Sequence, residues 1–177
     1  MTSWAKFGLA AALVAGVSTG AVAQETTNKV DEQTHWNVFA EPPQTPNECF
    51  GVAIPKETVN TDENGRIKAV RRGDIMLFVT FNRGKSGGVV SFTGGYPFAP
   101  NSFVSMEIGD NKFELFTDGE WAWPATPADD SKIIAAMKRG AEATLTARSS
   151  RGTITKDTFS LLGFTAASES AANYCGS

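Results

Sequence analysis

The chain has 177 residues, with 16 Lys and Arg against 19 Asp and Glu, and 41% of its residues are hydrophobic. This length fits one domain with its own core, because a chain of about 150 residues buries about 70% of its unfolded surface. The mild acidity argues against a nucleic-acid partner and gives no reason to expect adhesion to anionic lipid.

The first 23 residues have the order of a secretory signal peptide. Lys6 precedes the apolar run 7–17, and Ala21-Val22-Ala23 forms an A-x-A cleavage site. The apolar run is shorter than the roughly 20 residues that cross a bilayer as a helix. We therefore expect cleavage near Ala23, a mature chain with 15 basic and 19 acidic residues, and no transmembrane segment in it. Its expected location is the periplasm or the medium.

Two cysteines remain in the expected mature chain, Cys49 near its start and Cys175 near its end. An even number of cysteines in an exported protein usually indicates disulfide bonds. The two are too far apart in sequence for a thioredoxin-like pair, and His35 is the only histidine that could complete a metal site. We predict a structural disulfide, with free or intermolecularly paired thiols as the alternative, and we expect no metal or cofactor.

The segment 24–34 is polar and without a period, and is expected to be mobile. After it, short apolar runs alternate with turn residues. Strands are predicted over 36–39, 49–54, a stretch ending near 60, 66–71, 75–81, 89–93, 104–108, 112–116, 143–149 and 153–161. Asn64-Gly65 predicts a two-residue hairpin turn before the strand 66–71.

Two helices interrupt the strands. Thr126 can cap the first helix, Pro127 suits its first position, and Gly140 ends it. The second is predicted from about 165 to 174. Helical spacing places on one face of it the residues Phe164, Ala167, Ala171 and Cys175.

These elements predict a mainly β fold. These short strands, together with two short helices of which one forms the C-terminal end, favour an antiparallel β-sandwich or a flattened barrel. The predicted organisation is a signal peptide over 1–23, a mobile segment over 24–34 and a single β domain over 35–177.

No catalytic motif stands out: G-x-S-x-G, P-loop, zinc-ligand spacing and dinucleotide fingerprint are all missing from the sequence. Four carboxylates near two tryptophans could form a glycosidase-like or calcium site: Asp118, Glu120, Asp129 and Asp130. The same residues are also typical of a turn and of the start of a helix, without any catalytic or metal-binding role. We therefore predict a protein that is not an enzyme, with an envelope hydrolase using the carboxylates between Asp118 and Asp130 as the alternative.

Aromatic residues supply the candidate binding surface. Tyr96-Pro97-Phe98 and Trp121-Ala122-Trp123 each place two rings on one face of an extended segment. Partly exposed rings can stack on sugars or anchor a protein partner, and core packing is the alternative. A group of basic residues could also border the central strand, although the favoured explanation is solvated side chains that protect an exposed strand edge: Lys68, Arg71, Arg72, Arg83 and Lys85.

A series of motifs occurs in order along the chain: 71–75 (RRGDI), 90–98 (VSFTGGYPF), 113–116 (FELF), 122–127 (AWPATP), 135–138 (AAMK), 149–153 (SSRGT), 157–161 (DTFSL), 163–167 (GFTAA) and Cys175. Together they resemble the invasion-associated locus B family, from about Trp36 onward. The resemblance implies an exported periplasmic or envelope protein, in a family whose name records a role in host-cell invasion and virulence. It carries over no catalytic residue.

The expected function is therefore a non-enzymatic binding or envelope-support domain. Its expected partner is an envelope protein or a glycan, which the sequence does not identify, and the sequence gives no oligomeric state. The alternatives are the envelope hydrolase and a secreted adhesin that acts on host cells.

Overall fold

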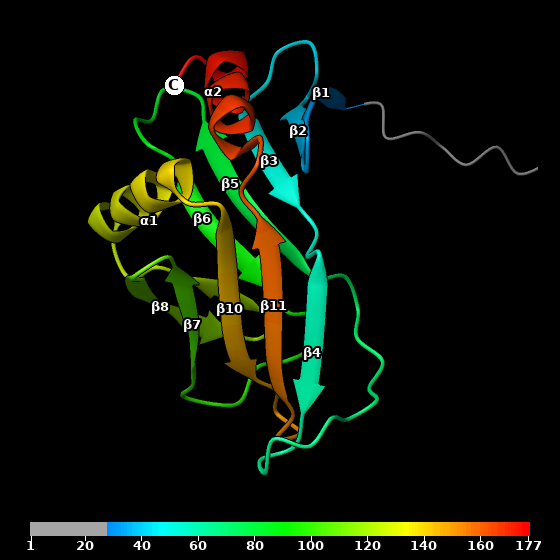
Figure 1. The fold of residues 1–177 in the computed structure, drawn as a ribbon. Coiled ribbons are helices and arrows are strands. Elements are labelled where there is room, and N and C mark those ends of the chain that lie inside the picture. Colours follow the sequence, from blue (N-terminus) through cyan, green and yellow to red (C-terminus); the bar gives the residue numbers. More distant parts are fainter. Residues whose placement is uncertain (1–27) are drawn as a thin grey trace, which may run out of the picture.

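The computed structural model describes residues 28–177, so the predicted signal peptide lies outside the described residues. Eleven antiparallel strands form one sheet, in the order β1-β2-β3-β5-β6-β9-β8-β7-β10-β11-β4 (Figure 1). Their bounds are β1 Lys29–Gln33, β2 Trp36–Glu41, β3 Glu48–Ala53, β4 Glu57–Thr61, β5 Met76–Asn82, β6 Val89–Thr93, β7 Phe103–Ile108, β8 Asn111–Asp118, β9 Trp121–Trp123, β10 Glu142–Arg148 and β11 Ile154–Ser160. The prediction of a mainly β, antiparallel fold is confirmed.

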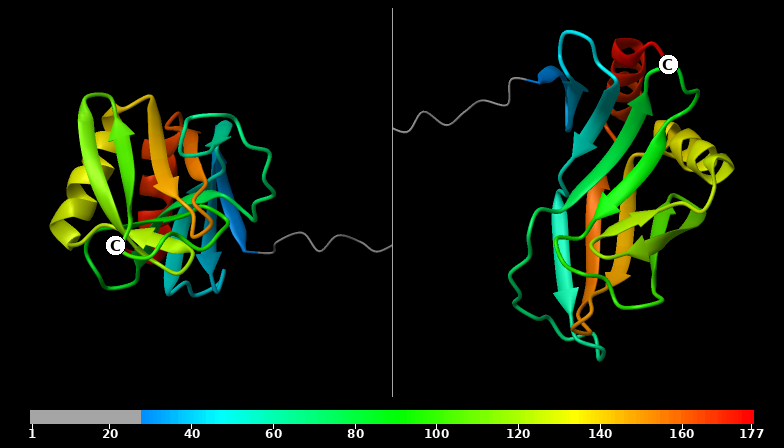
Figure 2. Two further views of the ribbon diagram at one scale, coloured as in Figure 1. Left: turned by 90° about the horizontal axis from the view of Figure 1, so that it is seen from below. Right: turned by 180° about the vertical axis from the view of Figure 1, so that it is seen from behind.

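The sheet bends back on itself without closing. Strands β5 and β6 pass on one side of the molecule and β10 and β11 on the other (Figures 1 and 2). Phe92 of β6 and Phe159 of β11 meet edge to face between them, with ring centroids 6.1 Å apart. The edge strands β1 and β4 do not pair with each other. The fold is thus a sandwich made from one folded sheet and not a barrel, which decides between the two predicted architectures.

Both helices lie where the sequence predicts them. Helix α1 (Pro127–Arg139) packs against β6, and Thr126 caps it by accepting a hydrogen bond from the Asp129 backbone N–H. Helix α2 (Phe164–Cys175) lies across β2 and β3 and closes the C-terminus. Neither helix of the described residues is long and apolar enough to span a membrane.

A disulfide fixes α2 to the sheet. Cys49 of β3 is bonded to Cys175 at the end of α2, with an S–S distance of 2.08 Å. Both cysteines are fully buried. Gly51, two residues along β3, faces the same helix: a Cβ built there would lie in ordinary van der Waals contact with Ala167 of α2, at 3.7 Å. The predicted disulfide is therefore present.

The structure differs from the sequence prediction at three places. Residues Trp121–Trp123, expected only as an extended segment, form the strand β9. Residues 29–33, within the segment expected to be mobile, form β1 and pair with β2. Residues 66–71 form no strand: Ile67 makes a single bridge to Thr61, and an irregular connection then runs to β5. The Asp62 carboxylate accepts hydrogen bonds from the backbone N–H groups of Asn64 and Arg66. This local turn satisfies the backbone in place of a regular hairpin ladder.

Candidate functional site

Tyr96 and Phe98, which the sequence places together on a possible contact surface, have different environments. Phe98 is only 6% exposed and packs on the core ring of Phe92, with centroids 6.0 Å apart. Its ring belongs to the core and offers no surface to a partner. Tyr96 is half-buried, and its hydroxyl shares a 2.5 Å hydrogen bond with the Thr155 hydroxyl. Tyr96 also lines a pocket of about 550 Å³.

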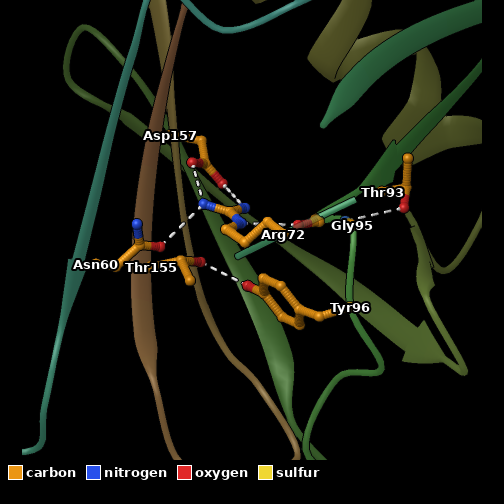
Figure 3. A network of polar contacts seen from close by, with 8 residues as sticks. Asn60, Arg72, Thr93, Gly95, Tyr96, Thr155 and Asp157 are labelled. Atoms are coloured by element: carbon orange, nitrogen blue, oxygen red, sulfur yellow. Dashed lines mark hydrogen bonds and ion pairs between the residues drawn. The ribbon is translucent and has the colours of Figure 1, made fainter. Parts of the chain in front are cut away.

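Beside Tyr96 lies a buried ion pair that joins the connection before β5 to β11 (Figure 3). Arg72 donates two hydrogen bonds, of 2.7 and 2.6 Å, to the two carboxylate oxygens of Asp157. It also donates to the Gly94 carbonyl at 2.9 Å and to the Asn60 side-chain oxygen at 3.2 Å. Its guanidinium carbon is 5.0 Å from the centre of the Tyr96 ring. Arg72 thus connects three segments of the chain and covers one face of the tyrosine.

Burial shifts the pKa values of two groups in this network, Asp157 and Tyr96. It raises the pKa of the Asp157 carboxyl, and the hydrogen bonds and charge of Arg72 oppose that rise. Burial raises the pKa of Tyr96 to about 12, although the Thr155 hydrogen bond and the Arg72 charge act in the other direction. Tyr96 is therefore a neutral hydrogen-bonding group at ordinary pH.

The local pattern around Arg72 does not reveal this ion pair, because adjacent basic residues at 71 and 72 are typical of a solvated edge. A signal was present in β11. Thr155, Asp157 and Phe159 alternate along the strand, so a charged residue shares the inner face with a core ring. A charged residue on a core face needs a partner, and Arg72 is that partner.

Trp121 and Trp123 of β9 face solvent, with 38% and 36% of their surface exposed. Alternate residues of a strand share a face, and the two rings stack at 6.3 Å with an interplanar angle of 20°. Trp121 also contacts Phe78 of β5 at 5.7 Å. Strand β6 runs between β5 and β9, and its residue opposite Phe78 is the small Ser91, which leaves room for the two rings to meet.

The same face carries further rings toward β2. Phe78 contacts Phe50 of β3 at 5.9 Å. Phe50 stacks at 5.2 Å on Phe39, its directly opposite neighbour on β2. This is the face of the sheet opposite α2, because the alternate residues Trp36 and Gly51 point toward the helix. No single strand carries enough of these rings for the sequence to reveal the array.

Two more rings extend the array in the other direction. Phe116 of β8 lies directly opposite Trp123, and Phe103 of β7 packs edge to face on Phe116 at 4.9 Å. Phe103 and Phe116 are 47% and 48% exposed. The aromatic stripe, as we call this array, consists of Phe39, Phe50, Phe78, Trp121, Trp123, Phe116 and Phe103. It runs roughly 30 Å along the bent sheet, at about 4.8 Å per strand.

Carboxylates border the aromatic stripe. Glu48 lies two residues from Phe50 on β3, and Glu114 and Asp118 lie two residues on either side of Phe116 on β8. Strand alternation therefore puts all three on the face of the stripe. All three are exposed, and none forms an ion pair with any other part of residues 28–177. We call these three residues the acidic border.

The four carboxylates of the hydrolase hypothesis are dispersed. Asp118 and Glu120 are exposed at the β8–β9 hairpin. Asp129, in α1, accepts hydrogen bonds from Thr126 and Lys132. Asp130 is 7% exposed and accepts a 2.7 Å hydrogen bond from the Val90 backbone N–H, and burial raises its pKa. The pockets lined by Glu120 and Asp130 contain one carboxylate each. Over residues 28–177, no three acidic, His or Cys side chains are placed to hold a metal ion.

The model of the family described as invasion associated locus B (IalB) protein matches residues 36–172 of this chain. The chain belongs to the IalB family. No curated protein and no solved structure shows significant similarity to it. The IalB match spans the Arg72–Asp157 network and every ring of the aromatic stripe, and it ends three residues before the disulfide cysteine of α2.

Proposed function

We propose that this IalB-family chain is an exported, non-enzymatic binding domain that contacts a partner protein through the aromatic stripe. The single observation that carries the proposal is the stripe itself, with four of its rings more than a third exposed. Soluble domains rarely leave so many neighbouring rings in water unless the rings contact a partner. Aromatic side chains in such a patch are the usual energetic centres of a protein interface.

The geometry of the rings favours a protein over a glycan. Trp121 stacks on Trp123, and Phe39 stacks on Phe50, with interplanar angles of 20° and 18°. Each ring of the stripe has a neighbouring ring at 4.9–6.3 Å, so only part of each ring surface is open to a partner. A sugar that stacks on an aromatic platform needs the ring faces, whereas apolar protein side chains pack well between ring edges.

The acidic border indicates the chemistry of the partner. Glu48, Glu114 and Asp118 give the rim of the stripe a negative charge, so a complementary surface combines apolar side chains with Lys or Arg. The expected partner is therefore a protein segment in which apolar and basic residues alternate. Contacts at such a rim influence the association rate and its salt dependence more than the final affinity.

Two features support export. The leader pattern predicts removal of the first 23 residues. The Cys49–Cys175 disulfide is typical of proteins that fold outside the reducing cytoplasm. Both features fit a periplasmic or secreted envelope protein. The family name suggests in addition a role in host-cell invasion, which forms part of the proposal.

Photo-crosslinking in living cells tests the proposal. A photoreactive amino acid replaces Trp123 on the stripe or, as the matched control, the exposed Lys156 on β11. We expect a discrete protein adduct from position 123 and none from position 156. The adduct should weaken in the variant Glu114→Gln/Asp118→Asn and at high salt, because both changes remove the charge attraction.

Each other outcome has a definite meaning. Equal adducts at both positions, a glycan adduct at position 123, or no adduct from a folded and exported variant would reject the stripe as a protein-binding surface. An adduct that forms only when host cells are present would assign the stripe to the adhesin alternative.

A further inference from the structure

The pocket beside Tyr96 is a second site, separate from the aromatic stripe. It has a volume of about 550 Å³, within the range of small-ligand sites. Three segments surround it: residues 69–72 before β5, 95–97 after β6, and 149–155 at the β10–β11 turn, and Glu120 completes its wall. None of its lining residues belongs to the stripe.

The pocket carries a local positive charge in an acidic protein. Arg71 and Arg151 line it, are exposed, and form no ion pair with any group of residues 28–177. Arg72 also lines it, but Asp157 neutralises its charge. Arginine side chains present paired N–H donors that match a carboxylate or a phosphate.

The hydroxyl groups add further donors. Tyr96 and Thr155 share one hydrogen bond, which uses one of their two hydroxyl protons and leaves the other for a ligand. Thr153 accepts a hydrogen bond from the Lys68 ammonium at 3.2 Å, so its own proton is also available. A ligand that pairs with these hydroxyl protons must carry several acceptor oxygens.

Glu120 restricts the ligand further. Its carboxylate is the one acidic group among the lining residues, and it repels a small dianion while it accepts hydrogen bonds from hydroxyl groups. Val70, Pro97 and the Tyr96 ring supply an apolar wall, and the pocket volume exceeds that of a simple anion. We propose that this pocket binds a sugar acid, with its carboxylate at Arg71 and Arg151 and its hydroxyl groups at Glu120 and the Tyr96–Thr155 pair.

Calorimetric titration of the purified, oxidised protein tests the assignment. The probes are D-glucuronate and D-galacturonate, with D-glucose as the neutral control and inorganic phosphate as the anion without a sugar. We expect at least one uronate to bind more tightly than glucose and phosphate. Arg71→Ala and Arg151→Ala should each weaken uronate binding about tenfold, the usual effect of losing one charge-assisted contact. The matched control Arg139→Ala, at the exposed end of α1, should leave it unchanged.

Several results would overturn the proposal. One is that neither uronate binds at millimolar concentration. Another is that glucose or phosphate binds as tightly as the better uronate. A third is that Arg139→Ala weakens uronate binding as much as the pocket variants do. Thermal unfolding of each variant checks that it remains folded. No residue of the stripe lines the pocket, so failure of the sugar-acid assignment is distinguishable from failure of the stripe.

Discussion

The Asp157 carboxylate on β11 accepts a hydrogen bond from each of the two terminal nitrogens of the Arg72 guanidinium. Arg72 lies 85 positions earlier in the chain. The Arg72 side chain is 6% exposed and that of Asp157 is fully buried. Because Arg72 also holds the carbonyl of Gly94 after β6, this pair ties the two halves of the folded sheet together. Its position makes it the first target for tests of stability.

Removal of one partner of this pair should destabilise the protein strongly. Arg72→Ala leaves the Asp157 carboxyl buried without its cation, and we expect a loss of about 3–5 kcal/mol in the free energy of unfolding, measured in urea. The double variant Arg72→Ala/Asp157→Asn should lose less than the sum of the single variants. Arg148→Ala, which breaks an exposed pair with Glu63, should cost less than about 1 kcal/mol. Similar losses in Arg72→Ala and Arg148→Ala would contradict the role of the buried pair.

Tyr96 should ionise only in strong alkali. Absorbance titration of a Tyr174→Phe variant isolates Tyr96, and we expect its midpoint near pH 12, because burial raises its pKa to about 12. The pKa is higher in the folded than in the unfolded protein, where it is about 10. The neutral Tyr96 phenol therefore contributes fully to the free energy of unfolding below about pH 10, and this contribution is lost as the pH rises through about 12. It amounts to about 2–3 kcal/mol at 1.36 kcal/mol per pH unit. A midpoint near pH 10 in the folded protein would contradict the burial of the phenol.

The disulfide should contribute a large part of the stability. The cysteines are 126 residues apart, and the chain-entropy model gives about 4–5 kcal/mol for a loop of that length. Cys49→Ser and Cys175→Ser should lower the free energy of unfolding by equal amounts, and the double variant should match either single variant. Thiol labelling of the denatured, unreduced protein should modify neither cysteine, and labelling of both would disprove the bond.

The exposed and the buried aromatic residues should respond differently to truncation. Phe98→Ala opens a cavity in the core and should cost about 3–5 kcal/mol of unfolding free energy. Trp121→Ala removes a ring that is 38% exposed and should cost about 1 kcal/mol, the value of its contacts with Phe78 and Trp123. Thermal and urea unfolding compare the two variants. A loss for Trp121→Ala as large as that for Phe98→Ala would show that the stripe stabilises the fold.

Export should expose a new N-terminus. Mass spectrometry of the protein recovered from the periplasm or the medium should find a chain that begins at Gln24. Replacement of Ala23 by Phe removes the small residue that the cleavage site requires, so the variant should keep its leader. Recovery of the uncleaved natural sequence from the cytoplasm would contradict export.

Local sequence signals are sufficient to predict both helices and most of the strands. The cap at Thr126, the proline after it and Gly140 fixed the bounds of α1, because these residues act within one helical turn. Alternating apolar residues located most strands, and the helical spacing of Ala167, Ala171 and Cys175 predicted the buried face of α2. Each of these signals depends on neighbours within a few residues.

Which aromatic rings are buried depends on contacts between segments that are far apart in the sequence. Phe98 and Trp123 have the same alternating pattern in sequence, yet one packs on Phe92 and the other faces solvent. A period of two separates the two faces of a strand but does not say which face another layer will cover. The stripe, the Arg72–Asp157 pair and the pocket beside Tyr96 all depend on strands that pair across long stretches of chain. The bend of the sheet brings their side chains together, and no local pattern encodes that bend.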